Sequence, residues 1–218
     1  MLLALSVVAA GLAGTGDLPA SECRATHGVP GPEDLELDLR DARGPRLIVS
    51  SQEQRQSPRP MGTIFSVPLA ADGTLGTPKA FELVARDARP FHPHGISLVA
   101  GAPSLLYVIN HVTDAEHAIE VFEIEGDRLL FRPPPLTSDL LTTPNDLVAL
   151  PDGHVYVTNS GAGRSLGGLL TALLGLRRGN VVHHHGGRWW PPIPAWWPSR
   201  ATRAVPTTLP PRRSTVWT

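Results

Sequence analysis

The chain has 218 residues, of which 41% are hydrophobic and 18% charged, and its formal net charge is −1. This length supports one sizeable core or two small ones, and the composition excludes a collagen-like, coiled-coil or fully disordered chain. The single cysteine, Cys23, excludes an internal disulfide framework and a cysteine-based zinc site.

The small net charge conceals two unlike parts of the chain. All 20 Asp and Glu precede residue 153, so residues 1–152, which contain 11 Lys and Arg, have a net charge of −9. Residues 153–218 contain eight Arg and no acid, a net charge of +8, and all five Trp follow residue 188. Because these Arg residues are interleaved with Pro and Trp and form no recognisable module, we expect no nucleic-acid partner.

Residues 1–16 form an apolar segment. Residues 2–13 read LLALSVVAAGLA, and small residues follow up to Gly16. This length is typical of the apolar core of a signal peptide and is short for a membrane-spanning helix. The segment predicts a secreted or membrane-associated protein. The alternatives are a misplaced start codon and a terminal element that packs on the core.

Short β-rich runs separated by turn residues follow between residues 45 and 160. We predict strands over residues 46–50, 63–69, 105–110, 119–125, 146–150 and 155–159. Turn sequences such as Asp72-Gly73 and Gly126-Asp127 separate them. Their spacing of about 8–15 residues, without long helices between them, predicts an all-β sandwich, barrel or propeller.

One later stretch has helical periodicity. Leucines at positions 166, 169, 170, 173 and 174 recur at the spacing of one helix face, so we predict an amphipathic helix over residues 166–176. Arg177 and Arg178 follow it, where positive charge suits the end of a helix. Its apolar face is expected either to contact lipid or to pack on the β domain.

Oxygen-bearing side chains and imidazoles gather at the ends of the predicted strands. No G-x-S-x-G elbow and no phosphate-binding P-loop occurs in the sequence. Paired carboxylates and side-chain amides suit a hard cation such as calcium, and neutral imidazoles beside it suit proton abstraction from water. Taken singly, each of these residues is an ordinary turn former or a packing histidine. The residues are Glu33, Asp34, His92, His94, Asn110, His111, Asn145, Asp146, Thr158 and Asn159.

Taken together and in order, these segments resemble the serum paraoxonase/arylesterase family. The matching stretches are GPEDLEL (31–37), LIVSS (47–51), FHPHGIS (91–97), YVINH (107–111), IEVF (119–122), NDLVA (145–149) and TN (158–159). The elements are individually short, but several of them occur in the order and at the spacing of the family. The resemblance extends from about residue 23 to about residue 182.

The resemblance implies a six-bladed β-propeller with two calcium ions in its central tunnel and hydrolysis of lactones or aryl esters at the tunnel mouth. Propeller closure brings strand ends from different blades to one axis, so that distant residues can share one ion. Glu33 and Asn145 match the ligands of a catalytic calcium ion. Asp34, the backbone carbonyl of Ile96 and Asp146 match the ligands of a structural calcium ion.

The resemblance also implies how the reaction proceeds. His94 and His111 match a histidine pair proposed to activate water, with His94 as the base and His111 as its tuning partner. Ser160 stands where the family usually has an aspartate that would orient this pair, and Cys23 matches a cysteine whose usual partner is missing here. Residues 166–176 fall where the family places a helix beside the active site that can contact membrane or lipoprotein.

The β pattern covers about 150 residues, whereas a six-bladed propeller needs about 240–300 at roughly 40–50 per blade. We therefore expect a partial propeller of roughly three blades within residues 23–182. Residues 183–218 are rich in Pro, Trp and Arg, and we expect an irregular tail that is frameshifted or disordered. Three of the family's five catalytic-calcium ligands have no match, so we expect this chain to be inactive and prone to aggregation.

Two other functions remain open. The chain could be a non-catalytic, calcium-bearing propeller that serves as a binding platform, which Ser160 favours. It could also be an enzyme similar to gluconolactonase or strictosidine synthase, which share the propeller architecture. The stretch HPHGIS argues against the second, and the presence of both PHG and NH argues against the first.

Overall fold

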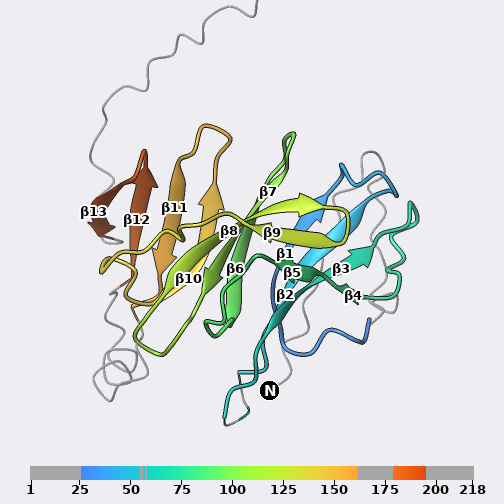
Figure 1. Cartoon of the computed structure of the whole chain (residues 1–218), viewed down its shortest axis with the longest axis horizontal. Helices are drawn as coiled ribbons and strands as arrows, with labels where there is room; N and C mark the ends of the chain where they lie inside the picture. The colour runs from blue at the N-terminus through green and yellow to red at the C-terminus, as the bar shows by residue number, and fades with distance from the viewer. Residues whose placement is uncertain (1–25, 55, 57, 162–178, 195–218) are drawn as a thin grey trace, which may run out of the picture.

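The computed structural model describes residues 26–54, 56, 58–161 and 179–194, and all its regular elements are β-strands (Figure 1). The strands form three separate sheets, which lie in chain order across the view from blue to red and do not close into a barrel. The predicted all-β partial propeller is therefore confirmed. Within these residues, no helix is long and apolar enough to span a bilayer. Residues 1–16, Cys23 and the predicted helix 166–176 lie outside the described residues.

The first sheet is an antiparallel meander of four strands. It consists of β1 (Pro32–Asp38), β2 (Arg46–Ser51), β3 (Thr63–Pro68) and β4 (Lys79–Ala80), paired in that order. The first strand predicted from the sequence begins at residue 46, which left Glu33 and Asp34 outside the β structure, and this was wrong. Both residues lie within β1, whose acidic side chains conceal the strand pattern.

The second sheet has the order β5-β9-β8-β7-β6. Its strands are β5 (Glu82–Val84), β6 (Pro93–Val99), β7 (Leu105–Asn110), β8 (Ala118–Glu125) and β9 (Arg128–Phe131). Its strand β5 pairs parallel with β9 and directly follows β4 of the first sheet, so one short segment joins the outer edges of both sheets.

The third sheet contains β10 (Pro144–Ala149), β11 (Val155–Asn159), β12 (Asn180–His185) and β13 (Arg188–Pro194). The β structure therefore continues past residue 182, and the expectation of an irregular chain from residue 183 is wrong as far as Pro194. Gly186 and Gly187 both have positive φ, as the tight turn of this hairpin requires. Strand β13 is an edge strand, where proline is tolerated because one row of N–H groups has no partner strand.

Two hydrophobic clusters hold the three sheets together. Ile48 and Ile64 of the first sheet pack with Leu106 and Phe122 of the second. On the other face of the second sheet, Ile109 packs with residues of the third. Because the second sheet packs against a neighbouring sheet on each face, its central strand β7 (LLYVIN) is a nearly continuous hydrophobic run.

Each sheet contributes its first long strand to a common centre. Strand β6 lies against both β1 and β10, and all three are edge strands of their own sheets. This is the arrangement of inner strands around a propeller axis. The starts of these three strands meet at one end of the molecule and form the candidate site.

Candidate functional site

A β-bulge interrupts the pairing at the same place in all three inner strands. The register shifts between Pro32 and Asp34 in β1, between Pro93 and Ile96 in β6, and between Pro144 and Asp146 in β10. A bulge leaves its extra residue unpaired and changes the direction of that side chain. The residues within the bulges are Glu33, His94, Gly95 and Asn145.

The bulge side chains of the three strands meet at the centre. His94 Nδ1 lies 3.0 Å from Glu33 Oε2, and His94 Nε2 lies 3.3 Å from Asn145 Oδ1. Burial alone would lower the pKa of His94, but the contacts with Glu33 and Asn145 outweigh it and raise the pKa above its usual value. The structure thus places three of the predicted site residues in direct contact.

Gly95 allows the strands to approach closely enough for these contacts. A Cβ atom at this position would lie 2.7 Å from the Asn145 carbonyl oxygen and 2.8 Å from Asp146 Cα. Both neighbours are backbone atoms, so a side chain would push β6 and β10 apart. The glycine is therefore required by the packing of the site.

Asp34, Ile96 and Asp146 lie one step further along the same strands. Asp34 Oδ2 accepts the N–H of Ile96 at 2.8 Å, and its Oδ1 accepts the N–H of Leu35. Asp146 Oδ1 accepts the N–H of Leu147 in the same way. Burial, and then the nearby charge of Asp146, raise the pKa of Asp34. Two carboxylates that repel each other form a suitable setting for a divalent cation.

Two hydroxyl groups fix these aspartates: Thr158, one of the candidate residues named from the sequence, and Ser50, which was not singled out there. Ser50 Oγ accepts the backbone N–H of Asp34 at 3.0 Å and donates to the carbonyl oxygen of His94 at 2.5 Å. In the third sheet, Thr158 Oγ1 accepts the N–H of Asp146 at 3.2 Å. Each hydroxyl lies directly opposite its aspartate in the antiparallel pair. Aligning the two hairpins would have revealed this repeat.

A row of three imidazoles leads away from the centre. The rings of His94 and His111 lie 5.2 Å apart, and the rings of His111 and His117 lie 4.8 Å apart. Nδ1 of His111 lies 2.9 Å from Nδ1 of His117. Burial, followed by the neighbouring histidines, lowers the pKa of His111 to about 3. The first two histidines were identified from the sequence, whereas His117, which stands between Glu116 and Ala118 and belongs to none of the matching stretches, was missed.

The comparisons with known proteins identify a family. The family model described as arylesterase matches residues 56–188, more than half of the chain. The chain belongs to the arylesterase family. It is also 38% identical over 88 residues to serum paraoxonase/arylesterase 2 of Gallus gallus, a match that covers 38% of this chain and 25% of that relative. The matched part thus spans about a quarter of the length of this curated relative.

The centre of the site offers oxygen donors, which suit calcium. The carboxylates of Glu33, Asp34 and Asp146 and the amide of Asn145 come from the starts of β1 and β10, the strands on either side of β6. These hard donors fit the ion in their chemistry. Within the described ranges, no three His, Cys, Asp or Glu side chains form a metal-binding cluster.

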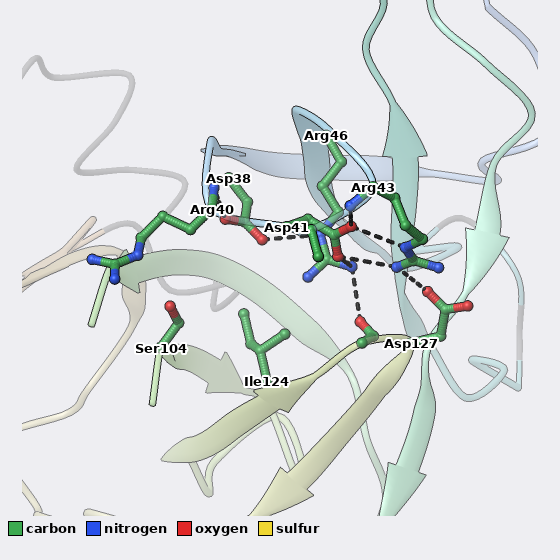
Figure 2. Close-up of a pocket in the computed structure, with 10 residues that line it drawn as sticks. Asp38, Arg40, Asp41, Arg43, Arg46, Ser104, Ile124 and Asp127 are labelled. Carbon is green, nitrogen blue, oxygen red and sulfur yellow. Dashed lines mark hydrogen bonds and ion pairs between the residues drawn. The ribbon is translucent and has the colours of Figure 1, made fainter. Parts of the chain in front are cut away.

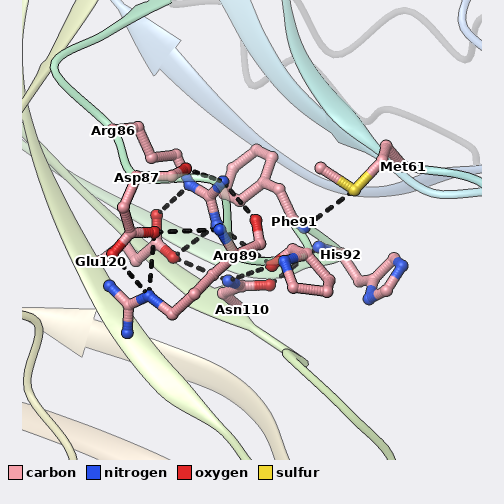
Figure 3. Close-up of polar contacts among 9 residues, drawn as sticks. Met61, Arg86, Asp87, Arg89, Phe91, His92, Asn110 and Glu120 are labelled. Carbon is pink, nitrogen blue, oxygen red and sulfur yellow. Dashed lines mark hydrogen bonds and ion pairs between the residues drawn. The ribbon is translucent and has the colours of Figure 1, made fainter.

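Asn110 has a supporting position beside the site. Its side chain is fully buried, accepts the N–H of His92 at 2.8 Å and donates to Glu120 Oε1 at 2.7 Å (Figure 3). Glu120 is also fully buried and pairs with Arg86 at 2.6 Å. These hydrogen bonds connect the segment before β6 to the end of β7, and His111 is the residue that follows β7. Asn110 thus orients the backbone beside the histidines and does not itself point at the centre.

A pocket lies at the Asp38 end of β1, away from the bulge, and its lining residues are drawn in Figure 2. Its volume is about 520 Å³. The buried guanidinium of Arg46 pairs there with Asp38 at 2.9 Å and Asp41 at 2.8 Å, and it donates to the Gly126 carbonyl oxygen. The acidic and basic groups of this pocket neutralise one another. The contacts of Arg46 join the first sheet to the turn between β8 and β9, so the charged residues of this pocket have a structural role.

The remaining predicted residues lie near the centre without entering it. Asn159 is buried and donates to the Leu140 carbonyl oxygen and to Asn180 Oδ1. Ser160 is exposed, and its backbone N–H donates to the Thr143 carbonyl oxygen. Among the described residues, no hydrogen bond joins the Ser160 hydroxyl to His94 or His111.

Proposed function

We propose that this chain contributes to the active site of a calcium-dependent hydrolase of lactones and aryl esters. The observation that supports this most directly is the meeting of Glu33, His94 and Asn145 at the bulges of three inner strands. Such a meeting needs three separate distortions of the sheets at matching positions. Bulges concentrate beside active sites because they redirect side chains.

His94 would transfer protons in this reaction, with the neutral ring of His111 as its tuning partner. The raised pKa of His94 suits it to accept a proton from water and return it to the leaving group near neutral pH, whereas His111, with a pKa of about 3, stays unprotonated there. Glu33 and Asn145 orient His94 through its two ring nitrogens. When calcium is bound, it supplies Lewis-acid polarisation of the ester carbonyl.

Glu33 and Asn145 would hold a catalytic calcium ion, and Asp34, Asp146 and the Ile96 carbonyl a structural one. Calcium usually takes six to eight oxygen ligands. The described residues offer two side chains for the catalytic ion, so its other ligands must come from elsewhere. Because these two ligands and His94 are in contact, we propose, in place of the inactive chain expected from the sequence, a chain that binds the catalytic ion weakly and turns over slowly.

We also propose that the protein is secreted or membrane-associated. Residues 1–16 resemble a signal peptide, and the apolar face predicted for residues 166–176 suits contact with lipid. Expression of the full chain and of a chain lacking residues 2–16, followed by fractionation, would test this. Equal distribution of both forms would contradict the proposal.

The central proposal is tested by hydrolysis of phenyl acetate and of a simple lactone, with calcium and with EDTA. We expect slow, EDTA-sensitive hydrolysis that Glu33→Gln and Asn145→Leu abolish. Glu82→Gln is the matched control, because the Glu82 side chain is 70% exposed and β5 is the edge strand of the second sheet opposite β6. Calcium binding without any hydrolysis would instead favour the binding platform.

A further inference from the structure

His117 is a third histidine whose position depends on the hairpin of β7 and β8. His111 directly follows β7 and His117 directly precedes β8, while Asn110 pairs with Ala118 between them. The two rings stand nearly perpendicular, at 84°, and their Nδ1 atoms are 2.9 Å apart. His117 is only 9% exposed. The hairpin thus forces the two imidazoles into one hydrogen bond.

This hydrogen bond contains a single proton. A contact of 2.9 Å between two ring nitrogens is stable only when one donates and the other accepts. Two charged rings would both present N–H groups and repel each other. Burial lowers the pKa of both rings, so both are neutral near neutral pH.

Which of the two histidines donates follows from the hydrogen bond that His117 makes on the far side of its ring, away from His111. The backbone of Thr142 forms a hydrogen bond with the His117 ring that raises its pKa against the effect of burial. A backbone carbonyl only accepts, so the ring nitrogen that faces it holds a proton. Because Nδ1 faces His111, that nitrogen is Nε2. Nδ1 of neutral His117 is then an acceptor, and His111 donates to it.

We propose that His117 is the positioning residue for His111. By accepting the Nδ1–H of His111, it fixes the ring and leaves the lone pair of His111 on Nε2. A catalytic imidazole needs such a partner, because its tautomer decides which nitrogen can accept a proton. The ring of His111 lies 5.2 Å from that of His94 at the centre. The role in catalysis rests on the proposed function, whereas the hydrogen bond does not.

Nitrogen-15 NMR of the full-length protein tests the hydrogen bond without any activity. At neutral pH, we expect His111 to be protonated at Nδ1 and unprotonated at Nε2. We also expect His117 to be protonated at Nε2. A wild-type His111 protonated at Nε2 would overturn the proposal, and this result needs no variant that might fail to fold.

Two variants of His117 with side chains of similar size test whether its hydrogen-bond acceptor, and not merely its bulk, positions His111. His117→Asn places an amide oxygen near the position of Nδ1, while His117→Leu has no acceptor. We expect the asparagine variant to keep the Nδ1–H form of His111 and the leucine variant to lose it. If both variants keep this form, or both lose it, the acceptor on His117 is not what positions His111.

Hydrolysis of phenyl acetate by the same variants tests the role in catalysis. We expect kcat to fall about 10- to 100-fold in His117→Leu, as is typical for loss of an orienting partner, while KM changes little. In His117→Asn, we expect kcat to fall less. A leucine variant with unchanged kcat would overturn the positioning role. If the wild-type chain shows no hydrolysis while the NMR result holds, the proposed function fails and the orientation of His111 by His117 stands.

Discussion

Glu33 Oε2 and His94 Nδ1 lie 3.0 Å apart, although they come from different sheets. Each occupies a bulge that follows a proline at the start of its strand. The contact therefore depends on the packing of β1 against β6 and on two local distortions. Because Glu33 is also an expected calcium ligand, binding of the ion and orientation of the imidazole depend on the same carboxylate.

Replacing Asp34 with asparagine should change stability mainly when calcium is present. Without the ion, the variant loses the repulsion from Asp146, but it also loses one of the two carboxylate oxygens that accept backbone N–H groups, so we expect little change in Tm. With excess calcium, the wild type should gain stability through binding and the variant should not. Thermal unfolding in calcium and in EDTA measures both effects. Glu82→Gln should respond to calcium as the wild type does, and equal calcium stabilisation of Asp34→Asn would exclude Asp34 as a ligand.

Gly95→Ala should separate β6 from β10. The added methyl group meets backbone atoms at 2.7 and 2.8 Å, and such overpacking costs about 1–3 kcal/mol. The ring signals of His94 should shift because Asn145 moves. Gly126→Ala is the control, since a Cβ there meets nothing within 4 Å but the positive φ still adds strain. Unchanged His94 signals in Gly95→Ala would show that the close approach is not needed.

Strands β7 and β11 were predicted with the same bounds that the structure shows, and four others with ends within two residues. In these strands, β-branched and aromatic residues dominate and turns flank both ends. Strands β1 and β6 were missed as strands, because acidic residues, proline, glycine and a bulge obscure their pattern. These two strands hold most of the candidate site. Their meeting is decided by packing between sheets, which no local pattern contains.

The resemblance to a family named the central residues, and its matching stretches include Ser50 and Thr158, but it gave these two no role and did not indicate His117. Their roles follow from cross-strand register and from the length of one hairpin. The interpretation of residues 183–218 from composition alone was wrong for β12 and β13, because proline is compatible with an edge strand. Composition does not show which strand will be at the edge.

Val182→Ala tests whether β12 belongs to the core. Val182 is fully buried against the third sheet's other strands, and loss of its methyl groups should cost about 1.5–3 kcal/mol of unfolding free energy. Val181, its half-buried neighbour, provides the control, because Val181→Ala should cost clearly less. Urea denaturation of both variants measures the difference. Equal and small losses would show that β12 does not pack as described.

Glu120→Gln should strongly destabilise the protein, although glutamine has nearly the same shape as glutamate. It leaves the guanidinium of Arg86, whose side chain is 6% exposed, without its charged partner. Removing one member of a buried ion pair costs about 3–5 kcal/mol. Glu125 lies on the same strand and pairs with Arg128 at the surface, so Glu125→Gln should change stability by about 0–1 kcal/mol. Urea denaturation compares the two, and similar midpoints would contradict a structural role for the buried network.

Acid should destabilise the folded protein through His111. In the unfolded chain this histidine takes up a proton near its usual pKa of 6.5, whereas in the folded chain it does so only near pH 3. Between these values the unfolded state binds more protons, so the contribution of His111 to stability is complete above pH 6.5 and is lost as the pH falls toward 3. Thermal unfolding between pH 8 and pH 4 should therefore show a steeper decrease in Tm for the wild type than for His111→Gln. The exposed His27 gives the control His27→Gln, whose curve should run parallel to that of the wild type. Parallel curves for His111→Gln and the wild type would show that the folded protein protonates this ring without cost.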